Sequence, residues 1–460
     1  MDPQKIPKRS IFWFRRKPQQ VAPSVVLLDR VNLIFVFVFA LLSFIIFWPI
    51  ISKIDFEEAF FTPLIPFLVS LFEIFKISAE DAIRILFITS FMISTVGIYL
   101  LVYDLTKRRI TSILAAAAYL VPPMPIFILS FFFPQKYENE LISAKSFFTI
   151  IYGDGAHFLA LALIPFAALF FLRFLKLAKS SDLLATVSIC ALVLLASRSQ
   201  ALNLFLVLIV VVLTDLFLGQ ARAKIKRFLL VLLLSLGLVS FWYTPRFWQE
   251  TILSFFSQLS VNFKFLFPLP ITIGFLALFV SFVFFARREN RQPIFLSFLV
   301  FIIFLILVGD WLLNARSFLP HPQRLVPNLN MFTAIVLALT LTAIVDSLHI
   351  VEVMAVESWS LAGKALGALV FGVVSLIVLA VGAFILSPWV ILLVSGRYGI
   401  WIKIKMEVLA DRQETLALAG RNFELIRQHT DGWQLWLGIA LSLSFMAVLI
   451  YLVSENEEEG

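Results

Sequence analysis

Charged residues are scarce in this sequence. Only 14% of the 460 residues are Asp, Glu, Lys or Arg, whereas 61% are hydrophobic. Soluble globular domains carry about one-quarter charged residues, so this composition excludes an ordinary soluble domain and indicates a chain embedded in a membrane. The apolar residues also occur in blocks near the roughly 20 residues that a helix needs to cross a bilayer.

The sequence also lacks the usual signatures of catalysis by metals or thiols. Cys190 is the single cysteine, so no intrachain disulfide can form, and we interpret it as a packing residue. The histidines at 157, 321, 349 and 429 are scattered, which argues against a histidine metal site. No Walker loop, GxSxG elbow, CxxC or HExxH motif is present. Asp310 is the one notable ionisable residue within a span, which argues against a proton- or sodium-coupled transporter.

The apolar blocks predict an all-α integral membrane protein with about twelve transmembrane helices. The expected spans are residues 31–51, 82–103, 110–133, 156–174, 183–197, 201–218, 228–244, 265–285, 293–313, 328–345, 365–394 and 433–453. The block 60–75 is shorter and contains Pro63 and Pro66, so we expect an interfacial or re-entrant helix on the outer face, within the first outer loop.

Charge patterning predicts the orientation of these spans. The net charge of +8 is spread over short basic clusters between spans, which is typical of topology signals and not of a nucleic-acid surface. We therefore expect a basic cytoplasmic N-terminal segment (1–30), a transmembrane core (31–345) and C-terminal transmembrane helices (346–453). The C-terminal part includes a short amphipathic outer loop, 396–432, and an acidic tail, 454–460, follows it.

Two groups of acidic and imidazole side chains are candidates for catalysis. Asp55, Glu57 and Glu58 directly follow the first span, where a low dielectric constant can turn carboxylates into general bases or metal ligands. Asp154 and His157 lie at the mouth of the fourth span. The alternative interpretations are a solvated charge cluster for the first group and, for the second, an N-cap at Asp154 with His157 in the first helical turn.

Four arginines at the expected outer ends of spans are candidates for binding a phosphate. They are Arg198, Arg246, Arg316 and Arg324. A guanidinium group fits the phosphate of a lipid carrier, although arginines at a membrane surface also reach ordinary lipid headgroups. Arg324 stands out because prolines at 320, 322 and 327 surround it.

Several passages together resemble the GT-C superfamily of membrane glycosyltransferases. They include the stretch FFTPLIPFLVSLFEIFKISAEDAIRIL after residue 59, YGDGAHFLALALIPFAALFFLRFLK, the paired short spans around SRSQ, SFWYTPRFW and HPQRLVPNLNMFTAIVLAL. Within the superfamily, the closest likeness is to the group of 6-pyruvoyl-tetrahydropterin-synthase-related membrane proteins. The resemblance extends from about residue 25 to residue 345.

This resemblance implies an enzyme that transfers a sugar from a polyprenyl-phosphate donor to an acceptor on the extracytoplasmic face of the cell membrane. An essential carboxylate in the first outer loop would correspond to Asp55, with Glu57 and Glu58 as near alternatives, and Arg324 would lie near the lipid phosphate. A divalent metal is compatible with this chemistry, but no residue requires a metal or another cofactor.

Two further interpretations remain open. The first outer loop is short and no large outer domain follows the eleventh span, which is compatible with a non-catalytic subunit of a membrane complex. Twelve helices are also common among carriers, so a transporter or flippase of lipid-linked sugars is the third alternative. The expected partners are therefore a lipid-linked sugar donor, membrane lipids and, for the non-catalytic interpretation, other subunits.

Overall fold

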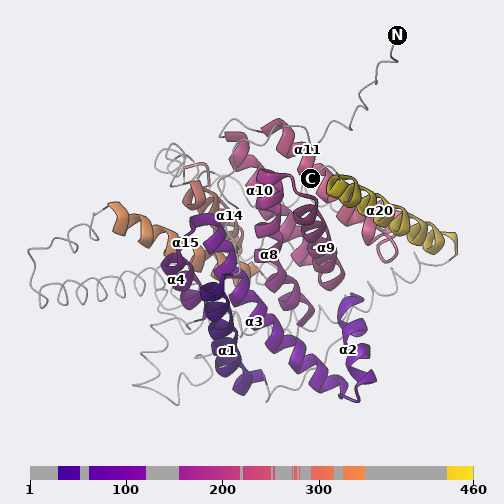
Figure 1. Cartoon of the computed structure of the whole chain (residues 1–460), viewed down its shortest axis with the longest axis horizontal. Helices are drawn as coiled ribbons and strands as arrows, with labels where there is room; N and C mark the ends of the chain where they lie inside the picture. Colours follow the sequence, from indigo (N-terminus) through magenta and orange to yellow (C-terminus); the bar gives the residue numbers. More distant parts are fainter. Residues whose placement is uncertain are drawn as a thin grey trace, which may run out of the picture.

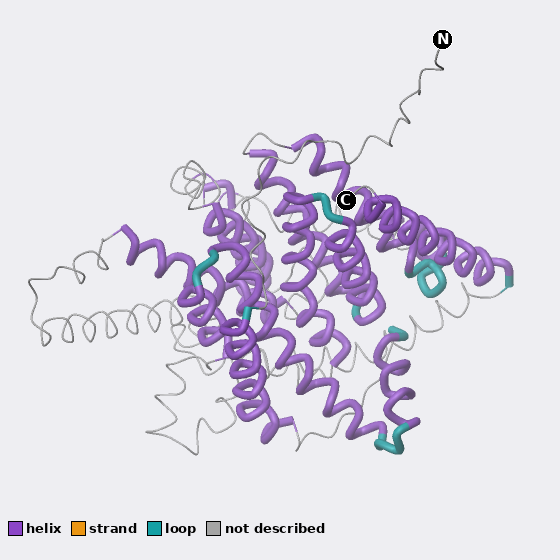
Figure 2. The backbone as a smooth tube through the Cα atoms, in the orientation of Figure 1, coloured by secondary structure: helices purple, strands orange, loops and turns teal. Residues whose placement is uncertain are grey.

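A computed structural model describes the larger part of the chain. The described residues are 29–51, 62–120, 155–217, 221–249, 292–314, 325–347 and 432–458, with a few positions between 252 and 279. These residues form helices joined by turns and contain no strand, as Figure 2 shows. The all-helical class predicted from the sequence is therefore confirmed for this part of the chain.

The described helices follow the expected blocks closely. They are α1 (Arg30–Ile51), α2 (Leu64–Ile74), α3 (Ala79–Thr106), α4 (Arg109–Leu120), α8 (Gly155–Leu177), α9 (Ser180–Ala196), α10 (Arg198–Phe217), α11 (Ala221–Leu238), α14 (Gln292–Asn314), α15 (Val326–Ser347) and α20 (Trp433–Glu458). In Figure 1, α8 lies in the middle of the bundle, among α3, α9 and α10, while α20 extends from one side.

Three helices are long and apolar enough to cross a membrane. Their apolar stretches are Ala79–Thr106, His157–Leu177 and Trp433–Ser454 among the described residues. The first two lie mainly inside the bundle, whereas the third is largely exposed. The expected spans 265–285 and 365–394 fall wholly or mostly outside the described residues.

The largest difference from an expected span is at 228–244, and several other helices start or end three to five residues outside their expected blocks. The span expected at 228–244 is α11, which begins at Ala221 and ends at Leu238, so 239–243 form a turn instead of the end of a helix. The span expected from 201 begins at Arg198. In both places charged or polar residues extend a helix beyond its apolar block, because Ala, Arg, Lys and Gln are good helix formers.

Polar contacts join α1, α3 and α4 at one end of the bundle. Asp29 caps α1 by accepting a hydrogen bond from the backbone N–H of Asn32 at 2.7 Å, and it pairs with Arg109 at the start of α4. The side-chain oxygen of Asn32 accepts a hydrogen bond from the Tyr99 hydroxyl at 2.9 Å. The start of α1 therefore lies beside the end of α3.

The same end also gathers the ends of α8 and α15 and the start of α11. Buried Asp104 pairs with Lys107 at 2.7 Å and with Arg173 of α8 at 3.3 Å. Arg227 of α11 donates to the carbonyl of Leu175 at 2.6 Å. We call this the basic end, defined by Arg30, Lys107, Arg108, Arg109, Arg173, Lys176, Lys179, Lys224, Lys226 and Arg227. The hydroxyls of Thr111 and Thr342 are hydrogen bonded at 2.9 Å, so the last part of α15 also lies at the basic end.

The opposite end of the bundle, which we call the polar end, comprises Thr62, the starts of α3, α8, α10 and α15, the end of α9 and the turn after α11. The Thr62 hydroxyl, just before α2, donates to the carbonyl of Ala196 at 2.6 Å. The Tyr243 hydroxyl donates to the carbonyl of Leu194 at 3.0 Å. Both carbonyls lie in the last turn of α9, where no following helical turn supplies a backbone N–H to bond them.

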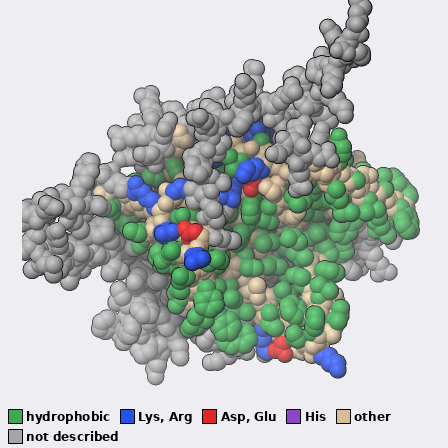
Figure 3. All heavy atoms as spheres, in the orientation of Figure 1, with side chains coloured by type: hydrophobic (Ala, Val, Ile, Leu, Met, Phe, Trp, Pro, Cys, Tyr) green, Lys and Arg blue, Asp and Glu red, His purple; other side chains and the backbone are tan. Residues whose placement is uncertain are grey.

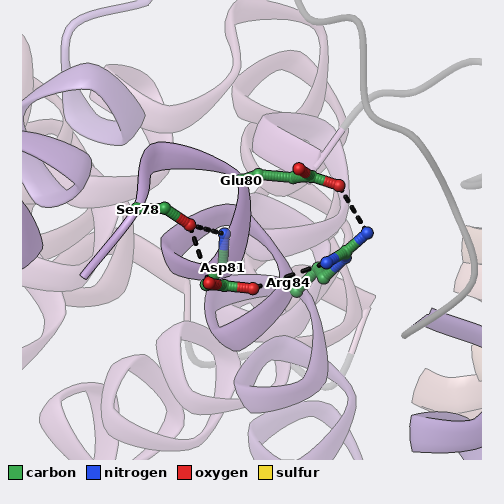
Figure 4. Close-up of polar contacts among 4 residues, drawn as sticks. All are labelled: Ser78, Glu80, Asp81 and Arg84. Carbon is green, nitrogen blue, oxygen red and sulfur yellow. Dashed lines mark hydrogen bonds and ion pairs between the residues drawn. The ribbon is translucent and has the colours of Figure 1, made fainter.

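The start of α3 carries its own capping group, drawn in Figure 4. The Ser78 hydroxyl accepts a hydrogen bond from the backbone N–H of Asp81 at 3.1 Å, which is the usual N-cap arrangement. Arg84 reaches back to Glu80 and Asp81, and the two carboxylates favour the positive end of the helix dipole. These charges fix the boundary between α2 and α3.

Helix α20 packs antiparallel on α11 through two glycines. A Cβ atom at Gly438 would lie 2.3 Å from the backbone oxygen of Ser240, and one at Gly237 would lie 2.2 Å from the Phe445 ring. The Ser442 hydroxyl also accepts a hydrogen bond from the backbone N–H of Phe241 at 2.9 Å. Because α11 leads from the basic end to the polar end, α20 leads back toward the basic end.

The surface in Figure 3 matches this division. Lysine and arginine side chains gather along the upper part of the view, above a broad hydrophobic surface over α3 and α20. A smaller group of charges lies at the lower edge, where α2 meets α3. A hydrophobic band between two charged rims is the pattern expected of a bundle surrounded by lipid.

Candidate functional site

The junction between α9 and α10 forms the centre of the polar end. Helix α9 ends at Ala196, Ser197 takes an extended conformation, and α10 begins at Arg198. A single residue thus reverses the chain, which confirms the predicted pair of short helices around SRSQ. The junction points its polar side chains toward the first turns of α8 and α15.

A buried hydrogen-bonded network connects α8, α10 and α15 at this junction. Gln200 and Asn328 are fully buried, and His157 is 6% exposed. The Gln200 amide nitrogen lies 2.6 Å from Nε2 of His157 and 2.9 Å from Oδ1 of Asn328. Asn328 returns a bond to Oε1 of Gln200 at 3.0 Å, and Asn203 donates to the same oxygen at 3.1 Å.

Two hydroxyls extend the network toward the outside of the bundle. Nδ1 of His157 lies 3.2 Å from the Ser199 hydroxyl and 3.5 Å from the Ser197 hydroxyl. The two hydroxyls are 3.1 Å apart, and the backbone N–H of Gln200 donates to Ser197 at 3.4 Å. The network therefore passes from buried amides to the hydroxyls of the two residues that flank Arg198 in the sequence.

Arg198 adds a positive charge to this neutral network. Its guanidinium carbon lies 5.7 Å from the centre of the Phe247 ring, within the range of a cation–π interaction. Phe247 and Trp248 in turn pack against Tyr243. This aromatic cluster holds the guanidinium group partly out of water, where an ionic partner interacts with it more strongly than in bulk solvent.

The helix directions reinforce this charge. The starts of α8, α10 and α15 meet at the network, and each carries a partial positive charge from its backbone N–H groups. Helix starts commonly bind phosphate or carboxylate groups for this reason. Together with Arg198 and the serine hydroxyls, they make the polar end suitable for an anion.

The structure brings two predicted site residues together and leaves others outside the described residues. His157 lies in the first turn of α8, as expected, and is joined through Ser199 to the junction that carries Arg198. Arg246 is exposed, one residue before Phe247. Asp55, Glu57, Glu58, Asp154, Arg316 and Arg324 fall outside the described residues, although Asp154 directly precedes α8 and Arg324 directly precedes Leu325 in the sequence.

The sequence interpretation missed the amides at the centre of the network. Gln200, Asn203 and Asn328 carry no charge and form no recognised motif. A signal was nevertheless present, because polar side chains inside apolar segments of membrane proteins face the bundle interior and hydrogen bond there. Asn328 and Gln200 each lie in the first turn of such a segment.

Within the described residues, no group of three or more His, Cys, Asp or Glu side chains is arranged to hold a metal ion. Cys190, interpreted as a packing residue, is fully buried in the core. The described part of the site therefore consists of one imidazole, amides, hydroxyls and a guanidinium group. Comparison of the chain with protein-family models, curated proteins and solved structures finds no match.

Proposed function

We propose that this chain is a membrane glycosyltransferase of the GT-C type. It would transfer a sugar from a polyprenyl-phosphate donor to an acceptor on the extracytoplasmic face. The observation that carries the proposal is the meeting of Arg198, the Ser199 hydroxyl and three helix starts at one end of an apolar bundle. This arrangement suits a phosphate group at a membrane surface.

The surroundings of the site suit a donor with a lipid tail. On α10, Leu202 is 58% exposed, one turn beyond Arg198, and Ile209 and Leu213 continue the exposed apolar surface along that helix. A polyprenyl chain can lie against such a surface while its phosphate reaches the guanidinium group. Trp433 and Trp436, exposed at the start of α20, are typical of the boundary between hydrocarbon and headgroups.

The transfer reaction can be divided among the candidate residues. The acceptor hydroxyl oxygen bonds to the anomeric carbon of the sugar, and the bond from that carbon to the lipid phosphate oxygen breaks. A carboxylate, for which Asp55 is the first candidate, takes the hydroxyl proton. Arg198, with Arg324, stabilises the negative charge that develops on the departing phosphate.

The side of the membrane follows from the two ends of the bundle. Lysines and arginines favour cytoplasmic loops, so the proposal places the basic end in the cytoplasm and the polar end outside. Both the start of α1 and the end of α20 then face the cytoplasm. The short helix α2 would lie at the outer surface, and its exposed apolar residues Phe67, Leu71 and Ile74 are compatible with contact with lipid there.

One observation favours a second candidate, a non-catalytic subunit of a membrane complex. The described members of the network include no carboxylate, and Gln200 and Asn328 hydrogen bond to each other. Such a network can serve only to hold α8, α10 and α15 together. The two candidates differ in whether the purified chain turns over a donor.

A transfer assay tests the proposal. The purified protein would be reconstituted in lipid and incubated with radiolabelled polyprenyl-phosphate sugars and with extracted acceptors. Transfer that falls at least tenfold in Arg198→Ala and in Asp55→Ala, but not in the basic-end variant Lys176→Ala, would support it. Turnover unaffected by Arg198→Ala would overturn the phosphate assignment. Absence of transfer with every donor, together with stoichiometric purification of a partner, would favour the subunit.

A further inference from the structure

The Gln200 amide uses all of its hydrogen-bonding positions. Its nitrogen faces His157 and Asn328, at 2.6 and 2.9 Å. Its oxygen accepts from the amide nitrogens of Asn203 and Asn328, at 3.1 and 3.0 Å. A primary amide has two N–H groups and two acceptor positions, so Gln200 is saturated at a site with no exposure to water.

The orientation of Gln200 is tied to its two asparagine neighbours. Rotating its amide by half a turn would set its oxygen against Oδ1 of Asn328 and its N–H groups against two other amide nitrogens. Each such contact leaves a buried polar group without a partner, at a cost of about 1–3 kcal/mol. Gln200 can therefore reverse only if Asn203 and Asn328 reverse with it.

This orientation dictates which nitrogen of His157 carries the proton. Because an N–H of Gln200 points at Nε2, that nitrogen has to accept, and the proton of the neutral ring lies on Nδ1. Nδ1 faces the Ser199 hydroxyl at 3.2 Å, so the ring donates to that oxygen. The hydroxyl's own hydrogen is then directed away from His157, toward Ser197 or toward a ligand beside Arg198.

We propose that Gln200 is a positioning residue that fixes His157 as its Nδ1–H tautomer and thereby makes Ser199 a hydrogen-bond donor to an anion at the polar end. His157 then acts through Ser199 and does not take a proton from the acceptor. The identity of the anion, a lipid phosphate, rests on the proposed function. The assignment of the tautomer does not depend on that function.

The tautomer can be measured directly. The protein would be labelled with ¹⁵N-histidine and reconstituted in lipid, and the signals of His157 would be assigned by their loss in His157→Gln. We expect Nδ1 to be the protonated nitrogen at neutral pH. A wild-type spectrum in which Nε2 carries the proton would overturn the proposal. A proton on Nε2 requires the reversed arrangement of all three amides.

Variants at position 200 separate positioning from packing. Gln200→Glu offers only acceptors to His157, so the proton should move to Nε2. Gln200→Leu offers His157 neither a donor nor an acceptor and should give a mixture of tautomers. This variant still tests the proposal if the glutamate variant fails to fold. Gln434→Glu, on α20, serves as the matched control and should leave the His157 signals unchanged. An unaltered tautomer in both position-200 variants would contradict the assignment.

Binding of a probe then separates this proposal from the proposed function. Decaprenyl phosphate would be titrated against the reconstituted protein, with decaprenol as the uncharged comparison. We expect the phosphate to bind at least tenfold more weakly to Ser199→Ala than to the wild type. If decaprenyl phosphate does not bind the wild type although the Nδ1–H tautomer is present, the assignment of a lipid phosphate at Ser199 is wrong. The role of Gln200 in fixing the tautomer would still hold.

Discussion

At the scale of single residues, the polar end depends on neutral side chains as much as on charged ones. Gln200 and Asn328 are fully buried and exchange two hydrogen bonds. Arg198, by contrast, keeps its charge at the edge of the network, over the Phe247 ring. Amides supply directionality without the desolvation cost of a charge, which suits a network that lies between three helices.

Replacing Asn328 should destabilise the protein more than an ordinary polar substitution. Asn328→Leu leaves one N–H and one acceptor position of the Gln200 amide unpaired, and each unpaired buried group costs roughly 1–3 kcal/mol. We expect a clearly lower thermal unfolding temperature in detergent. Ser444→Ala, an exposed position on α20, should change stability by less than about 0.5 kcal/mol. Equal effects of the two variants would contradict the structural role of the network.

Asp29 should contribute to stability only above acidic pH. The backbone N–H of Asn32 hydrogen bonds to its carboxylate and holds its pKa below the ordinary value of 3.8, and Arg109 lowers it further. A carboxyl group with a lowered pKa stabilises the folded state above the unfolded pKa, and the contribution disappears as the pH falls through the folded pKa.

Thermal unfolding between pH 3 and pH 7 checks this linkage. Asp29→Asn keeps a capping oxygen but removes the charge, so it should unfold at a lower temperature than the wild type at neutral pH. The difference should shrink as the pH approaches 3. A difference that is independent of pH would show that the ion pair with Arg109 adds nothing to the cap.

At the scale of elements, the sequence predicts where helices lie better than where they begin. The apolar blocks locate α1, α3, α8, α9 and α15 to within a few residues, because lipid requires each spanning backbone to bond internally. The charged first turns of α10 and α11 were assigned to loops, since hydropathy ignores helix propensity. Contacts between helices distant in the sequence, such as Gln200 with Asn328, follow from packing that no local pattern contains.

The contact between α11 and α20 should be sensitive to any side chain at its glycines. In Gly438→Leu, the new side chain meets the backbone of Ser240, which cannot rotate away. We expect α20 to separate from α11. A cysteine pair at Phe241 and Ser442, whose backbone nitrogen and hydroxyl are 2.9 Å apart, should form a disulfide in the parent and lose it in Gly438→Leu.

Two comparisons make this test specific. Ala440→Leu, at an exposed position of the same helix, should leave the crosslink intact. Crosslinking that is undiminished in Gly438→Leu would show that α20 keeps its register on α11 and would contradict the expected separation.

At the scale of the whole molecule, the two ends of the bundle have different chemistry. The basic end is held by ion pairs such as Asp104 with Arg173, whereas the polar end is held by amides and hydroxyls. The end of α15 lies at the basic end and the start of α20 at the polar end. The first described helix therefore starts, and the last one finishes, at the same end.

Thiol labelling in intact membranes should reveal this arrangement. Single cysteines would be placed at Lys176 for the basic end and at Lys76 and Trp433 for the polar end, after replacement of buried Cys190 by alanine. With a reagent that does not cross membranes, we expect labelling at Lys76 and Trp433 in sealed cells, and at Lys176 only after permeabilisation. The reverse pattern would place the candidate site in the cytoplasm and contradict the proposed reaction.

The one-residue junction at Ser197 also sets the rotational phase of α10. An α-helix turns by about 100° per residue, so inserting a single residue after Ser197 would rotate every side chain of α10 by more than a quarter turn relative to α8 and α15. Gln200 would then face away from Asn328, and Arg198 away from Phe247. Substitutions at this junction change one side chain, whereas a change in its length would rearrange the whole face of the helix.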